Sequence, residues 1–232
     1  MTAPSPAALP ARYCHSLDGL NRLLEVTRTL AEEVDLAPML DAIVREACHA
    51  LRCDRALLYQ FDAKRNVLSA TAGIAEGLIV PLDCGIAGHV ARCGAMLNVP
   101  DAARDSRWDP AYDNLVGYQT KTVLAAPLIA ARDGRLLGVL EMLNNAGGPF
   151  DSDDEALAVA FSCHAAAALD RARLIDEIHK RRELEHSLLA AREVQRRFMP
   201  GSLPAIAGYE VATWWFPNEA VGGDYCDVVP LA

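Results

Sequence analysis

The residues best suited to chemistry lie near the end of the sequence, in Val221-Gly222-Gly223-Asp224-Tyr225. Glycine has no Cβ, so a Gly-Gly turn lets the backbone approach an ion closely while the next residue supplies a carboxylate. Hard divalent cations prefer oxygen ligands of this kind. The pattern favours the beginning of a metal–phosphate site at Asp224 and Gly223, although an ordinary turn has the same residues. One carboxylate does not complete a metal site, and the chain ends eight residues after Asp224.

A long helix precedes this turn and must position it. From Ser152 to Met199 the sequence contains no proline or glycine. The stretch of 48 residues predicts a helix about 70 Å long, because each helical residue rises 1.5 Å. Ser152 and Glu155 have the types and spacing of a capping box, which predicts where this helix begins.

The second half of the predicted helix carries a seam of residues at alternating spacings of four and three, the mark of a coiled coil. The seam consists of Leu184, Leu188, Ala191, Gln195 and Phe198. Arg181-Arg182 interrupts its phase with the earlier Leu174 and Ile178, which indicates a stutter. The pattern predicts a parallel homodimer, and the alternative is a solvated surface helix.

Six short motifs follow one another from the end of this helix, and their order and spacing are more specific than any one of them. They are Glu193-Val194-Gln195, Phe198-Met199-Pro200, Leu203-Pro204, Gly208-Tyr209-Glu210, Trp215-Phe216-Pro217 and Val221-Gly222-Gly223-Asp224-Tyr225-x-Asp227. Together they resemble the N-terminal edge of the bacterial SpoIIE/RsbU-type protein phosphatases, a branch of the PPM (PP2C-like) serine/threonine phosphatases.

This resemblance implies that Asp224 helps to bind a pair of Mg²⁺ or Mn²⁺ ions in the full-length enzyme. The ions would activate a water that attacks a phosphoserine or phosphothreonine on a regulatory protein, such as an anti-sigma-factor antagonist. The other metal-binding aspartates would come from sequence beyond residue 232. We therefore expect this chain to hold no metal ion and to have no phosphatase activity of its own.

The preceding part of the chain, residues 17–171, alternates helical and strand patterns. Leucines at helical spacing predict two helices between residues 17 and 51, and a short helix is expected at 85–94. Residues 101–114 read as a polar loop. Strands are expected at 55–61, 67–72, 96–100, 123–129 and 136–143, with Asp133-Gly134 as a hairpin turn. These elements predict an α+β fold in which helices pack on one face of an antiparallel sheet.

Several motifs in this region occur in an order that resembles a GAF domain. They are Gly85-Ile86-Ala87-Gly88, the run from Asn98 to Asp105, Ala126-Pro127-Leu128, Gly138-Val139-Leu140 and the run from Phe150 to Glu155. The resemblance implies a regulatory module that binds a small ligand in a pocket under the sheet or serves only for dimerisation.

Part of a cyclic-nucleotide-binding signature, N-K…F-x-x-x-D-E, is also present. Asn144, Phe150, Asp154 and Glu155 match it, but Asn145 stands in place of the lysine. In the family that lysine pairs with the aspartate and braces the pocket. Asn145 can hydrogen-bond Asp154 but brings no charge. A cyclic nucleotide, another small ligand and no ligand therefore all remain open.

His89, within the predicted short helix, is a further candidate for contacting a ligand, with simple packing as the alternative. The ligand's identity is unknown from the sequence.

Composition excludes some partners. The net charge of −9 and pI of about 5.1 argue against nucleic acid, because phosphate binding needs a basic surface. No apolar run approaches the roughly 20 residues of a membrane helix. Seven cysteines without C-x-x-C spacing indicate reduced thiols and a cytoplasmic location.

Four parts are therefore expected: a disordered tail at 1–16, a GAF domain at 17–171, a coiled-coil linker at 172–199 and the start of a phosphatase domain at 200–232. In this interpretation the GAF domain senses a signal, and the linker passes it to the phosphatase. The alternatives are a ligand-binding GAF module and a structural dimerisation domain with an empty pocket.

Overall fold

The fold is built on a six-stranded antiparallel sheet with the strand order β3-β2-β1-β6-β5-β4. The strands are β1 (Cys53–Asp62), β2 (Val67–Gly73), β3 (Ile79–Pro81), β4 (Leu97–Val99), β5 (Val123–Ile129) and β6 (Leu136–Asn145). This computed structural model describes residues 35–73, 77–199, 205, 207–212, 214 and 221–223. The expected α+β class and the five expected strands are confirmed, and β3 is an additional short edge strand.

Strands β1 and β6 form the centre of the sheet, where Leu57 pairs with Glu141 and Tyr59 with Val139. Side chains alternate between the two faces of a strand, so all four of these residues share one face. On β6, every residue from Leu137 to Asn144 is buried. Such a strand needs apolar side chains on both faces, which makes the charged Glu141 an exception.

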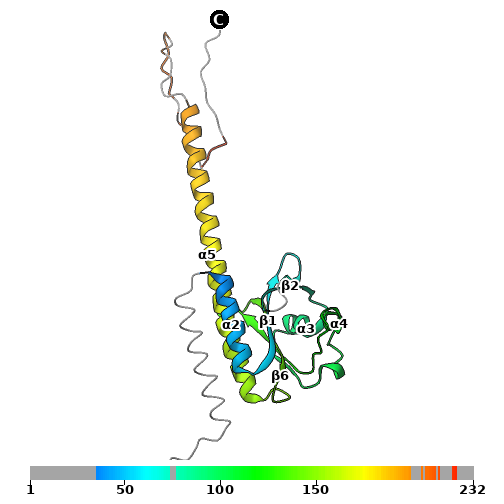
Figure 1. The fold of residues 1–232 in the computed structure, drawn as a ribbon. Helices are drawn as coiled ribbons and strands as arrows, with labels where there is room; N and C mark the ends of the chain where they lie inside the picture. Colours follow the sequence, from blue (N-terminus) through cyan, green and yellow to red (C-terminus); the bar gives the residue numbers. More distant parts are fainter. Residues whose placement is uncertain are drawn as a thin grey trace, which may run out of the picture. The chain divides into compact units, whose positions relative to one another are not determined.

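One face of the sheet is covered by α2 (Leu36–Ala50) and by the first part of α5 (Ser152–Phe198), which lie side by side (Figure 1). Apolar residues of α2 recur at helical spacing and are buried against the sheet. Phe161 of α5 is fully buried in the same cluster, together with Leu58 and Leu140 from the sheet. This layer is the larger part of the core.

The opposite face is covered by α3 (Gly85–Cys93), and the 3₁₀ turn η1 (Ala102–Arg104) and α4 (Ala111–Val116) follow β4. The expectation that helices lie on one face was therefore wrong, and so was a plain loop at 101–114. At Gly88, helix α3 packs closely against the backbone of Leu82, since an added Cβ would lie 2.6 Å from the Leu82 carbonyl oxygen. The second layer forms because β1, β5 and β6 carry apolar side chains on this face too.

Helix α5 begins at Ser152, but Asp151, rather than Ser152, caps it. The Asp151 carboxylate accepts hydrogen bonds from the backbone N–H groups of Asp153 (2.9 Å) and Asp154 (3.0 Å). In return, the Asp154 carboxylate accepts from the Asp151 N–H at 3.0 Å. This is a reciprocal capping box one residue earlier than the expected Ser152–Glu155 pair.

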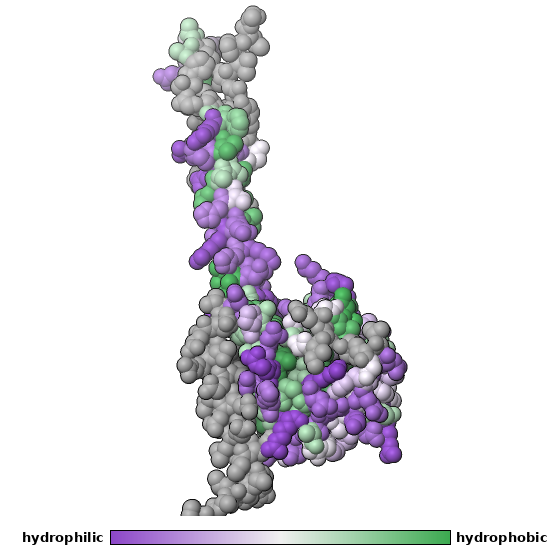
Figure 2. Space-filling view, viewed as in Figure 1, coloured by the Kyte–Doolittle hydropathy of each residue, from purple (hydrophilic) through white to green (hydrophobic). Residues whose placement is uncertain are grey.

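The chain divides into two compact units, Met1–Ala172 and Arg173–Ala232. Helix α5 continues through the second unit to Phe198, so the predicted long helix is confirmed at 47 residues. In that unit, hydrophobic residues (green) interrupt the hydrophilic surface of α5 (Figure 2). Leu184, Leu188, Ala191 and Phe198 of the predicted seam are exposed. No helix within the described ranges is long and apolar enough to cross a membrane.

The predicted tail at 1–16, the predicted helix that starts at residue 17, and Asp224 lie outside the described residues.

Candidate functional site

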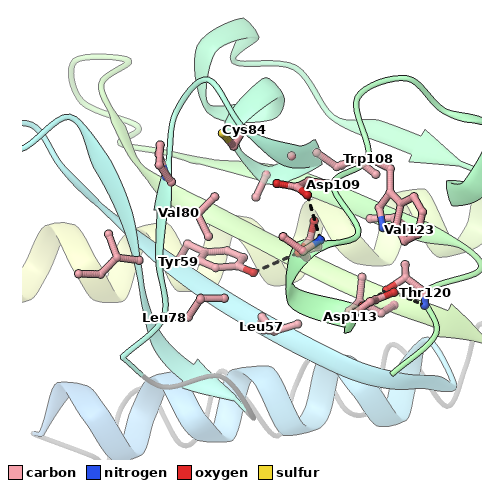
Figure 3. A pocket seen from close by; sticks show the side chains of 18 residues that line it. Leu57, Tyr59, Leu78, Val80, Cys84, Trp108, Asp109, Asp113, Thr120 and Val123 are labelled. Carbon is pink, nitrogen blue, oxygen red and sulfur yellow. Dashed lines mark hydrogen bonds between the residues drawn. The ribbon is translucent and has the colours of Figure 1, made fainter. Parts of the chain in front are cut away.

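A cavity of about 350 Å³ lies between the sheet and the elements on its α3 side (Figure 3). Its floor comes from the sheet, and its walls come from β3, the start of α3 and the segment that leads into α4. The lining residues are Leu57, Tyr59, Leu78–Pro81, Cys84–Ala87, Trp108, Asp109, Ala111, Asp113, Thr120, Val123, Glu141 and Leu143. This volume falls at the lower end of the range for small-molecule sites.

Glu141 is the group in this cavity whose chemistry stands out. It lies in the middle of β6, is 9% exposed, and is flanked by Leu57 on β1 and Ala125 on β5. The hydroxyl of Tyr59 donates a hydrogen bond to Oε2 of Glu141 at 3.3 Å. No other hydrogen bond to the Glu141 carboxyl group is formed by the described residues.

Burial raises the pKa of Glu141 from its ordinary 4.5 to about 7. The Tyr59 hydrogen bond opposes this shift, and the negative charge of Asp113 adds to it. A carboxyl group with this pKa changes between its neutral and its charged form near neutral pH. Such a perturbed group in a cavity marks a candidate site.

Asp113 holds the wall of the cavity in place. Its two carboxylate oxygens accept hydrogen bonds from the backbone N–H and from the hydroxyl of Thr120, at 2.6 and 2.9 Å. Both residues are buried, so these bonds hold the segment after α4 against that helix. Figure 3 shows Asp113 and Thr120 together beside the cavity.

The described side chains that line the cavity include three carboxylic acids and no lysine, arginine or histidine. Of the three, Asp109 accepts a hydrogen bond from the Ala111 N–H at 2.9 Å, and Asp113 is occupied by Thr120. The first turn of α3 borders the cavity, and its residues contain no acidic side chain. The N–H groups of a first helical turn lack partners within their helix and carry a partial positive charge. The cavity therefore has a negative side at Glu141 and a weakly positive side at α3.

None of the five ligand candidates from the sequence lines this cavity. Asn144 instead fixes the neighbouring segment. Its side chain accepts from the N–H groups of Lys121 (2.6 Å) and Thr122 (3.3 Å) and donates to the Tyr118 hydroxyl and the Gln119 carbonyl. Asn144 has a φ of 58°, a left-handed conformation that asparagine tolerates better than most residues. Its observed contacts stabilise the chain from 118 to 122, which contains Thr120 of the cavity lining.

The rest of the signature lies around the start of α5. Asn145 donates to Asp154 at 2.8 Å, as expected from the sequence. Glu155 accepts from the side chain of Asn98 at 2.8 Å, and Phe150 packs in the α2–α5 core layer. These residues connect β6 and β4 to α5. Their positions explain how the signature stabilises the fold.

His89 is half-buried on α3, and its Nε2 lies 3.4 Å from the Sγ of Cys93, one helical turn later. This contact within α3 favours the packing alternative for His89 over contact with a ligand. Within the described parts of the chain, no group of three or more His, Cys, Asp or Glu side chains is arranged to hold a metal ion.

Tyr59, Glu141 and Asp113 were missed by the sequence analysis. A signal for Glu141 was present, since it is the one charged residue in the apolar run from Leu136 to Leu143. Tyr59 and Asp113 carried no comparable signal, because an aromatic residue in a strand and an aspartate in a polar loop are both common.

In the second unit, Gln195 is engaged with the Gly-Gly turn. Its side-chain amide donates to the Gly222 carbonyl at 2.5 Å and accepts from the Gly222 N–H at 3.0 Å. These bonds connect the Glu193-Val194-Gln195 motif to the turn at Gly222-Gly223. Asp224 is not described, so the predicted metal site at Gly223 and Asp224 stays a prediction.

The family model of the GAF domain matches residues 35–169, more than half of the chain. The fold, with its antiparallel sheet and covering helices, agrees with this match. The chain therefore belongs to the GAF domain family.

Two curated relatives are phosphodiesterases. The chain is 30% identical over 176 residues to the "Probable 3',5'-cyclic phosphodiesterase pde-5" of Caenorhabditis elegans, covering 69% of this chain and 24% of the relative. It is 28% identical over 182 residues to the "Dual 3',5'-cyclic-AMP and -GMP phosphodiesterase 11A" of Takifugu rubripes, covering 72% and 20%. The chain thus spans a quarter or less of the length of these relatives.

Solved structures support the fold. The GAF domain of a phosphoenolpyruvate-protein phosphotransferase from Coxiella burnetii matches with a TM-score of 0.63 at 22% identity, covering 70% of this chain and 98% of the other. A free methionine-R-sulfoxide reductase from Neisseria meningitidis matches with a TM-score of 0.60 at 17% identity, covering 75% and 99%. At these identities the similarity concerns the fold alone.

Proposed function

We propose that residues 35–169 form a sensory domain that binds a small ligand in the cavity beside Glu141. The observation that carries this proposal is a partly open cavity of about 350 Å³ with a buried, hydrogen-bonded carboxyl group at its floor. A purely structural domain gains nothing from such a group, because burying a carboxyl group without full hydrogen bonding is unfavourable. The match to GAF regions of cyclic-nucleotide phosphodiesterases also favours a ligand-binding role.

Native mass spectrometry of the purified chain tests this function, because it reports any retained small molecule directly. Cyclic AMP and cyclic GMP are the first ligands to titrate by calorimetry, because the two curated relatives are cyclic-nucleotide phosphodiesterases. Ala111→Trp provides a blocked variant, since Ala111 lines the cavity and is exposed on one side. Ala103→Trp is the matched control, because Ala103 is exposed and does not line the cavity. Binding that is lost in A111W and kept in A103W supports the proposal, and equal binding by both variants contradicts it.

A second function is favoured by the hydrogen bonds between Gln195 and Gly222. The motifs that resemble a SpoIIE/RsbU-type phosphatase include both residues, and these bonds tie the helix directly to the turn before Asp224. In this proposal the chain is the regulatory and dimerising part of a metal-dependent protein serine/threonine phosphatase. A signal in the cavity would alter α5, and α5 would reposition the Gly-Gly-Asp turn through Gln195.

This second function predicts Mg²⁺- or Mn²⁺-dependent hydrolysis of a phosphoserine peptide by the full-length gene product. Gln195→Ala should change that activity, because it removes both bonds to Gly222. A reading frame that ends at Ala232, or an activity that Q195A leaves unchanged, would contradict it. The ligand-binding function would be unaffected by either result.

A further inference from the structure

The charge of the cavity points to the class of ligand. Resting on the proposed ligand-binding function, we propose that the cavity takes a compact organic cation. The expected ligand has an ammonium or amidinium group that pairs with Glu141 and a small apolar body that fills the remaining space.

The first argument is that Glu141 has no cationic partner among the described residues that line the cavity. Its side chain is buried in the middle of the sheet, and the Tyr59 hydroxyl is its one hydrogen-bond partner among the described residues. A buried carboxylate with no cation beside it is energetically costly, and proteins normally supply a paired charge or several donors. A ligand that brings N–H groups and a positive charge would supply both.

The second argument is the set of charged and titratable groups that face Glu141. They are Tyr59 from β1, Cys84 before α3, Asp109 before α4 and Asp113 in α4, all of which line the cavity with Glu141. None of them is a cation, and both aspartates already accept hydrogen bonds, from Ala111 and Thr120. Glu141 is therefore the acceptor left for a ligand, and the negative charge of Asp113 adds to the attraction for a cation.

The third argument is the shape and chemistry of the remaining walls. Leu57, Val123 and Leu143 provide apolar surface, and Tyr59 and Trp108 provide aromatic rings. Aromatic faces attract organic cations through their quadrupole. These walls suit an organic body better than a bare metal ion, which needs several oxygen ligands.

A competing ligand is an anion such as a cyclic nucleotide. It would be attracted to the first turn of α3, but it would meet three carboxyl groups and no basic side chain. A second competitor is a neutral acceptor that receives a hydrogen bond from protonated Glu141. The two protonation states give opposite pH dependence, so binding measurements separate these cases.

Three probes of similar size test the proposal by calorimetry or by ligand-observed NMR: 2-phenylethylamine, 2-phenylethanol and 3-phenylpropionate. They carry a positive charge, no charge and a negative charge on the same aromatic body. We expect the amine to bind at least about tenfold more tightly than the alcohol, a usual gain for a charge-assisted hydrogen bond in a buried site. Its affinity should rise between pH 5.5 and 8, because Glu141 becomes charged while the amine remains protonated.

Glu141→Gln keeps the size of the side chain and removes its charge, so it should abolish the preference for the amine. Asp41→Asn is the matched control, since Asp41 is an exposed carboxylate on α2, remote from the cavity lining. Wild-type protein that binds the amine no better than the alcohol would overturn the proposal, as would an unchanged preference in E141Q.

The proposed function can fail separately. Tighter binding of 3-phenylpropionate, cyclic AMP or cyclic GMP would overturn the cation and leave ligand binding intact. No binding of any probe, together with no retained mass in native mass spectrometry, would count against both proposals.

Discussion

The Tyr59 hydroxyl lies 3.3 Å from Oε2 of Glu141, across the two central strands of the sheet. Tyr59 pairs directly with Val139, so Glu141 is its diagonal neighbour two residues along β6. Diagonal neighbours on one face of a sheet are within reach of an aromatic side chain. The register of β1 and β6 therefore creates this contact, and it places both polar groups at the floor of the cavity.

The stability of the domain should depend on pH through Glu141. Its pKa is raised to about 7 in the folded chain, whereas the unfolded chain releases the same proton near its ordinary value of 4.5. The folded state thus loses relative stability as pH rises from about 4.5 to 7, and the shift corresponds to about 3 kcal/mol. Glu141→Gln should therefore be more stable relative to wild type at pH 8 than at pH 5, by up to this amount.

Urea denaturation at the two pH values, followed by circular dichroism, measures the effect. Asp41→Asn on the surface of α2 should show no such pH-dependent gain. If E141Q changes the free energy of unfolding equally at pH 5 and pH 8, then folding does not raise the pKa of Glu141, and the prediction is wrong.

Asn144 should contribute more to stability than its backbone conformation explains. Asn144→Ala removes the hydrogen bonds to segment 118–122 and leaves buried backbone groups without partners, so we expect a loss of about 2–4 kcal/mol. Asn66 has nearly the same φ, 57°, in an exposed turn. Asn66→Ala should cost about 1 kcal/mol, the penalty for a left-handed residue alone. Similar losses in the two variants would show that the side-chain bonds of Asn144 contribute little.

Gly138 should not tolerate a side chain. Its added Cβ would lie 2.0 Å from the carbonyl oxygen of Tyr59, and a backbone atom in a central strand cannot move away easily. Gly138→Ala should therefore lower the thermal midpoint strongly and weaken ligand binding by displacing Tyr59. Gly147→Ala is the control, because its Cβ would meet only the side-chain oxygen of Asn145 at 3.2 Å. A midpoint for G138A within the range of G147A would contradict the close approach.

The seam on α5 predicts dimerisation. Leu184 and Leu188 are 60% and 38% exposed in the single chain, and a second copy would cover both. Light scattering should give twice 25.0 kDa for the wild type and a monomer for a Leu184→Lys, Leu188→Lys variant. Leu189 is equally exposed but lies outside the seam, so Leu189→Lys should remain dimeric. A monomeric wild type would leave the solvated-helix alternative.

Much of this architecture could be predicted because short-range sequence patterns indicate its helices and strands. The period of the apolar residues predicted α2, and the lack of proline and glycine between Ser152 and Met199 predicted α5. Apolar runs on either side of an Asp133-Gly134 turn predicted β5 and β6. These signals depend only on residues a few positions apart, so they can be recognised without knowing the tertiary structure. The GAF resemblance rests on the same local motifs, and it is confirmed.

The candidate site could not be predicted in this way. Tyr59, Asp113 and Glu141 are separated by dozens of residues, and they meet only because β1 lies beside β6 and α4 folds back over the sheet. The signature residues Asn144, Asp154 and Glu155 were visible as a motif in the sequence, but their places beside the segment 118–122 and at the start of α5 depend on the same pairing.

The sequence by itself therefore determined most of the elements, the family and the acidic character of the chain, but not β3, η1 or α4. The tertiary structure alone decided which face of β6 borders the cavity, and hence that Glu141 is buried at a cavity with three acids and no base among its described lining. The physical reason is that the pKa and the binding preference of a carboxyl group depend on its burial and on the charged groups near it. Both are set by long-range strand pairing.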